Sequence, residues 1–217
     1  MDEATTGVAG SAGEAVLAHL GGQRACRVFS GEPVSDSDLT RILEAATHAP
    51  SAENAQPWIF VVVQSARIRA ELDALTRRIW EAGGRHHAER TLTPRLFASV
   101  DAFMSGGYGG APVLVVAAGD GRSGAGAAVL AASVLPACQN LLLAAGALGY
   151  GSSMTTLAAQ APDEMAALLE LPAQVRPFAV IPIGRAARPL GPPRRRPVSA
   201  VAHRDRFGEP WPGSAPR

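Results

Sequence analysis

The stretch HAPSAENAQPW, from His48 to Trp58, joins a helical pattern to an apolar run. It contains a series of hydrogen-bonding side chains where a tight turn alone would join the two elements. Proline fixes φ, so Pro50 and Pro57 stiffen the bend and hold its polar groups in place before a ligand arrives. Hydroxyl and amide groups can match both donors and acceptors on a ligand. The candidate binding side chains are Ser51, Asn54 and Gln56.

A helix precedes this bend and a strand follows it. Ser35 is a typical N-cap, before apolar residues with helical spacing that stop near Pro50. The run WIFVVV, residues 58–63, is typical of a buried strand. Similar runs predict strands at 111–119 and 175–184. Further helices are predicted over 14–20, 66–82, 94–104, 127–148 and 162–171, with a polar loop, GGRHHAER, at 83–90.

The alternation of helices and strands at long spacings predicts a layered α+β or α/β domain. The chain has 217 residues and is 47% hydrophobic, which suffices for one substantial core. Residues 1–13 are small and polar and are predicted to be disordered. The domain is expected over 14–185. Residues 186–217 form a Pro/Arg-rich extension that cannot build a core of its own.

Composition excludes several functions. The net charge of +1 points to neither nucleic acid nor a membrane surface. All 20 basic residues are Arg, which excludes Schiff-base, pyridoxal-phosphate and P-loop lysines. Two distant cysteines and the lack of a secretory signal predict a reduced, cytoplasmic protein. Residues 123–162 are uncharged, but their glycines and alanines favour a buried core helix over a membrane span. No metal site is predicted, because His86-His87 lacks a third ligand.

Three other stretches carry a resemblance when taken in order with the bend. They are RACRVFSGEPV (24–34), QNLLLAAGALGYGSS (139–153) and VIPIGRAARPLGPPRRRPV (180–198). The chain resembles the FMN-dependent nitroreductase family over roughly residues 20 to 210. The family pattern is roughly Arg-Ser-x-Arg-x-Phe, Ala-Pro-Ser-x-x-Asn-x-Gln-Pro-Trp, Leu-Gly-x-Gly, and a strand end followed by an Arg. The bend is the most specific of these matches.

The resemblance implies a nitroreductase-like α+β fold, with a central mixed β-sheet flanked by helices. It also implies an intertwined homodimer with an FMN at each of two interface sites, and an extension at 186–217 that wraps the partner subunit. NADH or NADPH would deliver a hydride to flavin N5, and a small nitroaromatic, quinone or other conjugated acceptor would receive it. Because the cofactor carries this chemistry, no catalytic side chain is assigned.

The implied cofactor-binding residues share chemistry that suits FMN. Guanidinium groups bind phosphate bidentately, amides match the polar edge of the flavin ring, and glycines let a backbone approach a flat ligand. Of the two tail arginines that could contact phosphate, Arg195 is favoured over Arg196. Ala25 stands where the family has Ser, and Gln23 where many members have a basic residue, which would lower phosphate affinity unless the tail arginines compensate. The expected residues are Arg24, Ala25, Arg27, Pro50, Ser51, Asn54, Gln56, Gly149, Gly151, Ser152, Arg195 and Arg196.

Other interpretations stay open at this stage. The arginines could be solvated, Asn54 and Gln56 could cap backbone groups, and Gly149 could be an ordinary helix C-cap. The same flavin site could serve an oxidase or dehydrogenase of a natural-product intermediate. It could also belong to a non-catalytic flavin-binding protein whose active face is blocked by a lid at residues 85–110.

Overall fold

The computed structural model describes residues 5–212, with side chains from residue 10 onward. Its sheet has the strand order β1-β2-β4-β3, and every neighbouring pair is antiparallel. The bulged β2–β4 pairing shifts register between Ala117 and Ala118. The strands are β1 (Trp58–Val63), β2 (Val113–Asp120), β3 (Gly151–Ser152) and β4 (Val175–Gly184).

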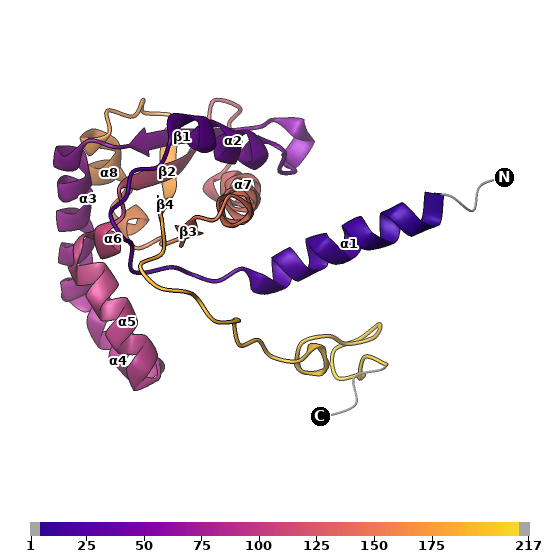
Figure 1. Cartoon of the computed structure of the whole chain (residues 1–217). Helices are drawn as coiled ribbons and strands as arrows, with labels where there is room; N and C mark the ends of the chain where they lie inside the picture. The colour runs from indigo at the N-terminus through magenta and orange to yellow at the C-terminus, as the bar shows by residue number, and fades with distance from the viewer. Residues whose placement is uncertain (1–4, 213–217) are drawn as a thin grey trace.

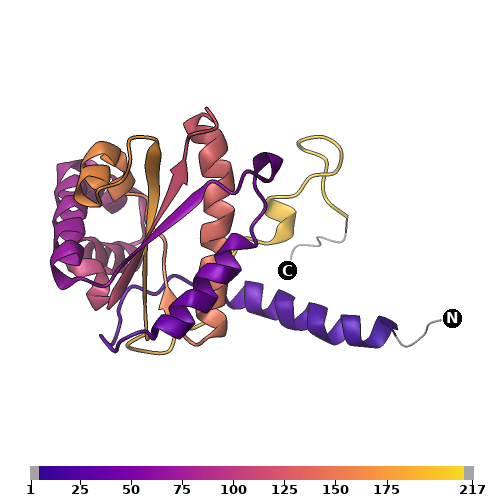
Figure 2. The ribbon, with the colours of Figure 1, turned by 90° about the horizontal axis from the view of Figure 1, so that it is seen from above.

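Helices cover both faces of this sheet (Figures 1 and 2). One core lies between the sheet and the pair α2 (Asp36–Thr47) and α7 (Ala127–Ala147). The second core lies on the opposite face, under a group of helices that contribute Leu72, Phe103 and Met165. These helices are α3 (Ala66–Ile79), α5 (Pro94–Ser105), α6 (Gly107–Gly110), η3 (Ala158–Gln160) and α8 (Pro162–Leu168).

The remaining elements lie at the margins of the layers. A helix α1 (Thr5–Gly22) and the C-terminal tail, which includes η4 (Val198–Ala200), extend away from the layered body (Figure 1). The bend contains a short helix, η1 (Ala52–Asn54). A π-helical turn, η2 (Trp80–Gly84), leads into α4 (Arg85–Thr91).

Helix α7 is the one helix, within the part of the chain that the structure describes, that is long and apolar enough to cross a membrane. Its inner side packs against α2 and the sheet, with Val134, Cys138 and Leu141 fully buried. It is therefore a core helix, as its alanine-rich sequence predicts.

The structure differs from the sequence-based expectations in three places. Helix α1 begins at Thr5, so residues 5–13 are helical where disorder was expected; the run contains no proline, the residue least compatible with a helix. Residues 1–4 lie outside the described chain. The polar stretch 83–90 is largely helical, in η2 and α4, because its polar side chains line an exposed helix rather than a loop.

The third difference concerns the sheet, which is antiparallel in its four strands rather than mixed. The chain starts β2 at the end of the sheet where β1 stops, and it starts β4 at the end where β2 stops, since Val63 pairs with Leu114 and Asp120 with Val175. Helical connections are long enough for either direction, so alternation alone does not decide it. Parallel pairing occurs in a single described bridge, between Ala25 and Ser152.

Candidate functional site

A cleft of about 270 Å³ opens beside the carboxyl end of α7. Its walls come from the end of α1, the last turns of α7, the α7–β3 turn and the tail. Several of the expected cofactor-binding residues lie here, along with two that were not expected, His19 and Tyr150. The polar lining is His19, Gln23, Arg24, Tyr150, Gly151 and Ser152.

The N-terminal arginine segment is held at this cleft by backbone pairing. Ala25 forms a parallel bridge with Ser152, and the Cys26 amide donates to the Ser152 carbonyl at 2.8 Å. Three residues after Cys26, Phe29 pairs antiparallel with Ala186, two residues after the end of β4. The segment therefore crosses the end of the sheet, and its backbone contacts would be unchanged by the replacement of Ser with Ala at position 25.

The tail arginines fall into two groups. Arg195 donates to the Gln23 carbonyl at 3.2 Å, and Arg24 donates back to the tail at Gly191 and Pro192, at 2.8 and 3.1 Å. Arg196 instead donates to Ala200, within the tail itself. The structure thus brings Arg195 next to Arg24 and leaves Arg196 apart from the cleft.

This arginine cluster has no compensating carboxylate. None of the ion pairs among the described residues includes Arg24, Arg27, Arg188 or Arg195. Burial lowers the pKa of the Arg27 guanidinium, and the neighbouring charge of Arg24 lowers it further. A half-buried cation beside like charges is destabilised unless an anion joins it. The cluster is therefore suited to a phosphate.

Arg188 belongs to this cluster although its sequence position gave no signal beyond its place after β4. Burial raises the pKa of the Cys26 thiol, while the charges of Arg27 and Arg188 act in the opposite direction. Both guanidiniums therefore lie near Cys26, which itself adjoins Ser152. Sequence inspection missed Arg188 because the family pattern places its tail arginine further along.

Gly109 packs closely against the backbone of the N-terminal arginine segment. It has φ +67°, and a Cβ there would overlap the carbonyl oxygen of Arg27. Its own carbonyl accepts from the Phe29 amide at 2.9 Å. Nearby, the buried Asp73 carboxylate accepts from the Gly107 amide at 2.9 Å. The GGYGG segment is thus a platform for Arg27 rather than simple punctuation before β2.

The two glycines after α7 have structural explanations. The backbone N–H of Tyr150 donates to the Ala145 carbonyl, and that of Gly149 donates to the Gly146 carbonyl. With φ +77° at Gly149, these two bonds form a Schellman motif. At Gly151 a Cβ would lie 2.7 Å from Sγ of Cys26. Gly149 is therefore a helix C-cap, as the alternative interpretation held. Gly151 is required by the packing of the arginine segment on β3.

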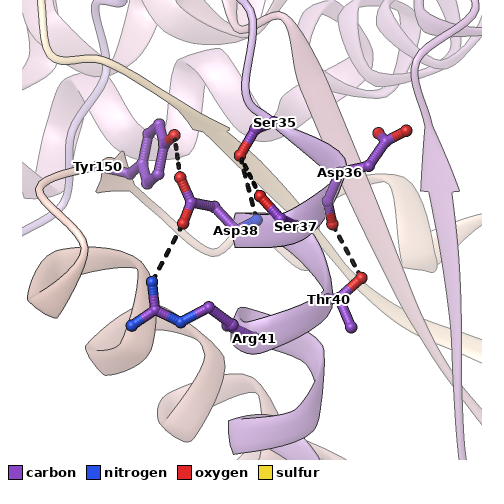
Figure 3. A network of polar contacts seen from close by, with 7 residues as sticks. All are labelled: Ser35, Asp36, Ser37, Asp38, Thr40, Arg41 and Tyr150. Carbon is purple, nitrogen blue, oxygen red and sulfur yellow. Dashed lines mark hydrogen bonds and ion pairs between the residues drawn. The ribbon is translucent and has the colours of Figure 1, made fainter.

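Between these glycines, Tyr150 ties the turn to α2 (Figure 3). Its hydroxyl donates to Oδ2 of Asp38 at 2.8 Å, and Arg41 donates to Oδ1 of the same carboxylate at 3.3 Å. Arg185 lies over the Tyr150 ring at 4.6 Å and donates to Gly149 at 3.3 Å. The hydrogen bond from Tyr150 is the main cause that lowers the pKa of Asp38.

The amide-bearing bend has strained geometry. Glu53, Asn54 and Gln56 all have left-handed backbone conformations, with φ of 53°, 52° and 47°. The Gln56 side-chain amide donates to Asn54 Oδ1 at 3.2 Å, and the Gln56 backbone N–H donates to the Ser51 hydroxyl at 3.0 Å. Asn54 and Gln56 are exposed and bond each other. Strain of this kind in an exposed, polar segment is typical of a binding site.

Within one chain this bend does not meet the arginine cluster. The Ala52 amide contacts Ser133 near the start of α7, whereas Gly146, thirteen residues later, borders the cleft. At 1.5 Å per residue, the two sites lie about 20 Å apart along the helix. The expected residues therefore form two groups at opposite ends of α7: Pro50, Ser51, Asn54 and Gln56 at one end, and Arg24, Ala25, Arg27, Gly149, Gly151, Ser152 and Arg195 at the other.

The chemistry of these donors fits FMN. The guanidinium cluster suits a dianionic phosphate, and the paired amides offer both donors and acceptors to the edge of a flavin ring. A metal is not suggested, because no group of three metal-ligating side chains occurs among residues with described positions.

Known proteins share the whole architecture. The FMN reductase [NAD(P)H] of Bacillus subtilis is 26% identical over 203 residues, covering 88% of this chain and 74% of that protein. A Desulfovibrio desulfuricans protein solved in complex with FMN has a TM-score of 0.71 at 27% identity, covering 91% of this chain and 98% of that one.

Other matches are shorter. Two curated relatives, from Archaeoglobus fulgidus and Streptococcus pyogenes, are 52% and 49% identical over 42 and 45 residues. These matches cover 19% and 21% of this chain, and the chain spans only 24% and 22% of the length of those relatives. The Nitroreductase family model matches residues 20–185, which include the whole sheet and the arginine segment. This chain therefore belongs to the nitroreductase family.

Proposed function

We propose that the protein is an FMN-dependent oxidoreductase that takes electrons from NADH or NADPH and passes them to a small conjugated acceptor, such as a nitroaromatic compound or a quinone. The observation that carries this proposal is the cluster of Arg24, Arg27, Arg188 and Arg195 without a carboxylate partner among the described residues. Bound FMN would supply the hydride chemistry.

The residues themselves would bind and orient the cofactor. The arginines would hold its phosphate, with the backbone of Ala25 and Ser152 forming the wall behind it. Asn54 and Gln56 would contact the polar edge of the ring, held ready by Pro50 and by the Ser51 hydroxyl. Since Pro50 and the internal hydrogen bonds restrict the bend, little ordering cost would remain on binding.

We further propose that the protein is a homodimer in which each FMN lies between subunits. One chain cannot bring the bend to the arginine cluster, because the two lie at opposite ends of α7. A second copy running the other way would place its bend at the cleft. The outer face of α7 is also uncharged and not buried, as expected for a helix covered by a partner. This face is formed by Val129, Ala132, Leu135, Gln139, Leu143 and Ala147.

The two extended arms support the same assembly. Helix α1 and the tail extend away from the layers (Figure 2). Both expose large apolar side chains. Many large apolar side chains exposed together on two arms are typical of an interaction surface, and a wrapped partner subunit would cover them. Residues 186–217 would then form the extension that embraces the second copy. The exposed residues are Val16, Leu17, Leu20, Leu190, Val198, Val201, Phe207 and Trp211.

The test is the visible spectrum of the purified protein, followed by titration with NADH and NADPH without oxygen. We expect a yellow protein, or one that turns yellow when reconstituted with FMN, and bleaching by at least one of the two donors. Sedimentation should give a dimer. A protein that stays colourless with excess FMN, or that binds FMN as a monomer, would contradict the proposal.

The same titration distinguishes the alternatives. A flavin that is reduced only by an organic substrate and reoxidised by O₂ would indicate an oxidase. Flavin that no donor reduces would indicate a binding protein. The stretch 85–110 is mostly helical. Its Asp101 accepts from Trp80, outside the stretch, at 2.9 Å, and from Arg85, within the stretch, at 3.1 Å. Cys26 and Cys138 are buried free thiols, which suits the cytoplasmic location that we also propose.

A further inference from the structure

The bend at residues 51–56 holds a strained shape with little support from packing. Three of its residues, Glu53, Asn54 and Gln56, have left-handed backbones, which non-glycine residues adopt only when their surroundings impose it. Most of its hydrogen bonds are internal: Asn54 to Ser51, Ala55 to Ala52, and Gln56 to both Ser51 and Asn54. Internal bonds alone do not fix where the bend lies on the body.

Packing beneath the bend is also incomplete. A cavity of about 270 Å³ separates it from the loop before α7 and from the first turns of that helix. The bend contributes Ala52, Glu53, Ala55 and Pro57 to its lining. An open space on this side means that few van der Waals contacts oppose movement of the bend.

One hydrogen bond connects the bend to the core. The Ala52 amide donates to Oγ of Ser133 at 3.3 Å, and among described residues no other hydrogen bond leaves positions 51–56. Ser133 lies in α7 with only 2% of its surface exposed, among apolar core residues. Its hydroxyl also donates to Val129 one turn earlier, at 3.3 Å. Because the hydroxyl hydrogen is directed at Val129, the lone pairs of Ser133 Oγ are directed toward the Ala52 amide.

We propose that Ser133 is a positioning residue that anchors the strained bend, and through it sets the placement of Asn54 and Gln56 on the flavin ring edge. The inference rests on the proposed FMN function. A polar residue is otherwise unexpected on this face of α7, since alanine would be the better helix former and would pack equally well. The hydroxyl is retained because it fixes the bend.

The first test is Ser133→Ala, with Ser133→Thr as the conservative variant that keeps the hydroxyl. Loss of one hydrogen bond should weaken FMN binding by about 2- to 12-fold in fluorescence titrations of the apoprotein. It should also lower kcat at saturating FMN and shift the bound-flavin absorption band, because the ring edge meets displaced amides. Ser133→Thr should restore these values, and thermal stability should not fall in Ser133→Ala.

Cys138→Ala is the matched control, because Cys138 is fully buried in the same helix and faces the same core without contacting the bend. It should lower stability without changing the absorption band. If Ser133→Ala leaves affinity within twofold and the band unchanged, or if Cys138→Ala changes them equally, the positioning role is wrong.

A second measurement does not depend on flavin. Hydrogen exchange of the backbone amides of residues 51–56 in the apoprotein should be faster in Ser133→Ala than in the natural protein, and unchanged in Cys138→Ala. Equal exchange in all three would overturn the anchor. A natural protein that binds no FMN would overturn the proposed function instead, and the exchange comparison would still decide whether Ser133 holds the bend.

Discussion

Replacing Arg27 with Ala should have opposite effects on cofactor binding and on the apoprotein. In the structure this guanidinium is half-buried, burial and Arg24 both lower its pKa, and it has no ion pair among the described residues. Its charge therefore stabilises the protein only when an anion is bound. Removing it takes away attraction to phosphate and also removes repulsion in the apoprotein.

The magnitude follows from the kind of contact. A hydrogen bond to a charged group contributes about 1.5–3 kcal/mol, so the Kd for FMN should rise roughly 10- to 150-fold in Arg27→Ala. Arg27→Lys should recover part of this loss, because an ammonium keeps the charge but cannot bind two phosphate oxygens in one plane. The melting temperature of the apoprotein should stay the same or rise.

The assay is a fluorescence titration of FMN into apoprotein, paired with thermal melts with and without FMN. Arg67→Ala is the matched control, since Arg67 is an exposed arginine on α3 that pairs with Glu71 and lies away from the cleft. It should change neither quantity. The reasoning is refuted if Arg27→Ala binds FMN within twofold of the natural protein, or if its apoprotein melts several degrees lower.

Three other perturbations test the surrounding structure. Gly109→Ala should destabilise the fold by more than the roughly 1–2 kcal/mol expected for a left-handed alanine, because the added Cβ also overlaps the Arg27 carbonyl. Gly107→Ala is the control in parallel urea melts: at φ +63° and in open space, it has the backbone cost alone. Tyr150→Phe should raise the pKa of Asp38 toward its ordinary value of 3.8, because it removes the hydrogen bond that lowers this pKa. A lowered folded-state pKa stabilises the protein above the ordinary value, so the variant should lose stability fully near neutral pH. In urea melts at several pH values, this loss of stability should vanish as pH falls through the folded-state pKa. Deletion of 186–217 should abolish both the dimer and FMN binding in sedimentation and absorbance measurements, and a stable yellow dimer would contradict the role given to the tail.

Periodicity was sufficient to place most elements. The predicted bounds of β1 and β4 match those observed, and α7 differs by one residue at its end. These segments are apolar runs or stripes whose burial pattern is local, so the sequence carries it directly. Strand direction was not readable in this way, because it depends on the end of the sheet to which each helical connection returns.

The site was predictable where side-chain chemistry carries the signal and not where contact across the fold does. Arg24, Arg195 and the bend could be found from residue type and order. Two contacts join residues more than 80 positions apart: the hydrogen bond that the Ala52 amide donates to Ser133, and the packing of Gly109 on Arg27. Gly151 has a second reason that sequence does not show: a side chain there would overlap Cys26, and its role toward the cofactor stays a prediction.

The placement of the two groups along α7 links assembly to cofactor binding. If an FMN contacts the arginines of one copy and the bend of another, it binds the dimer and not the separated chains. A ligand that binds only one state stabilises that state by mass action, so FMN must tighten the dimer, and dilution must release FMN. In that assembly the uncharged outer face of α7 would serve both purposes, because it would join the copies and set the distance between the halves of each site. A charge placed on that face, as in Ala132→Arg, should therefore weaken FMN binding without touching any residue that contacts the cofactor.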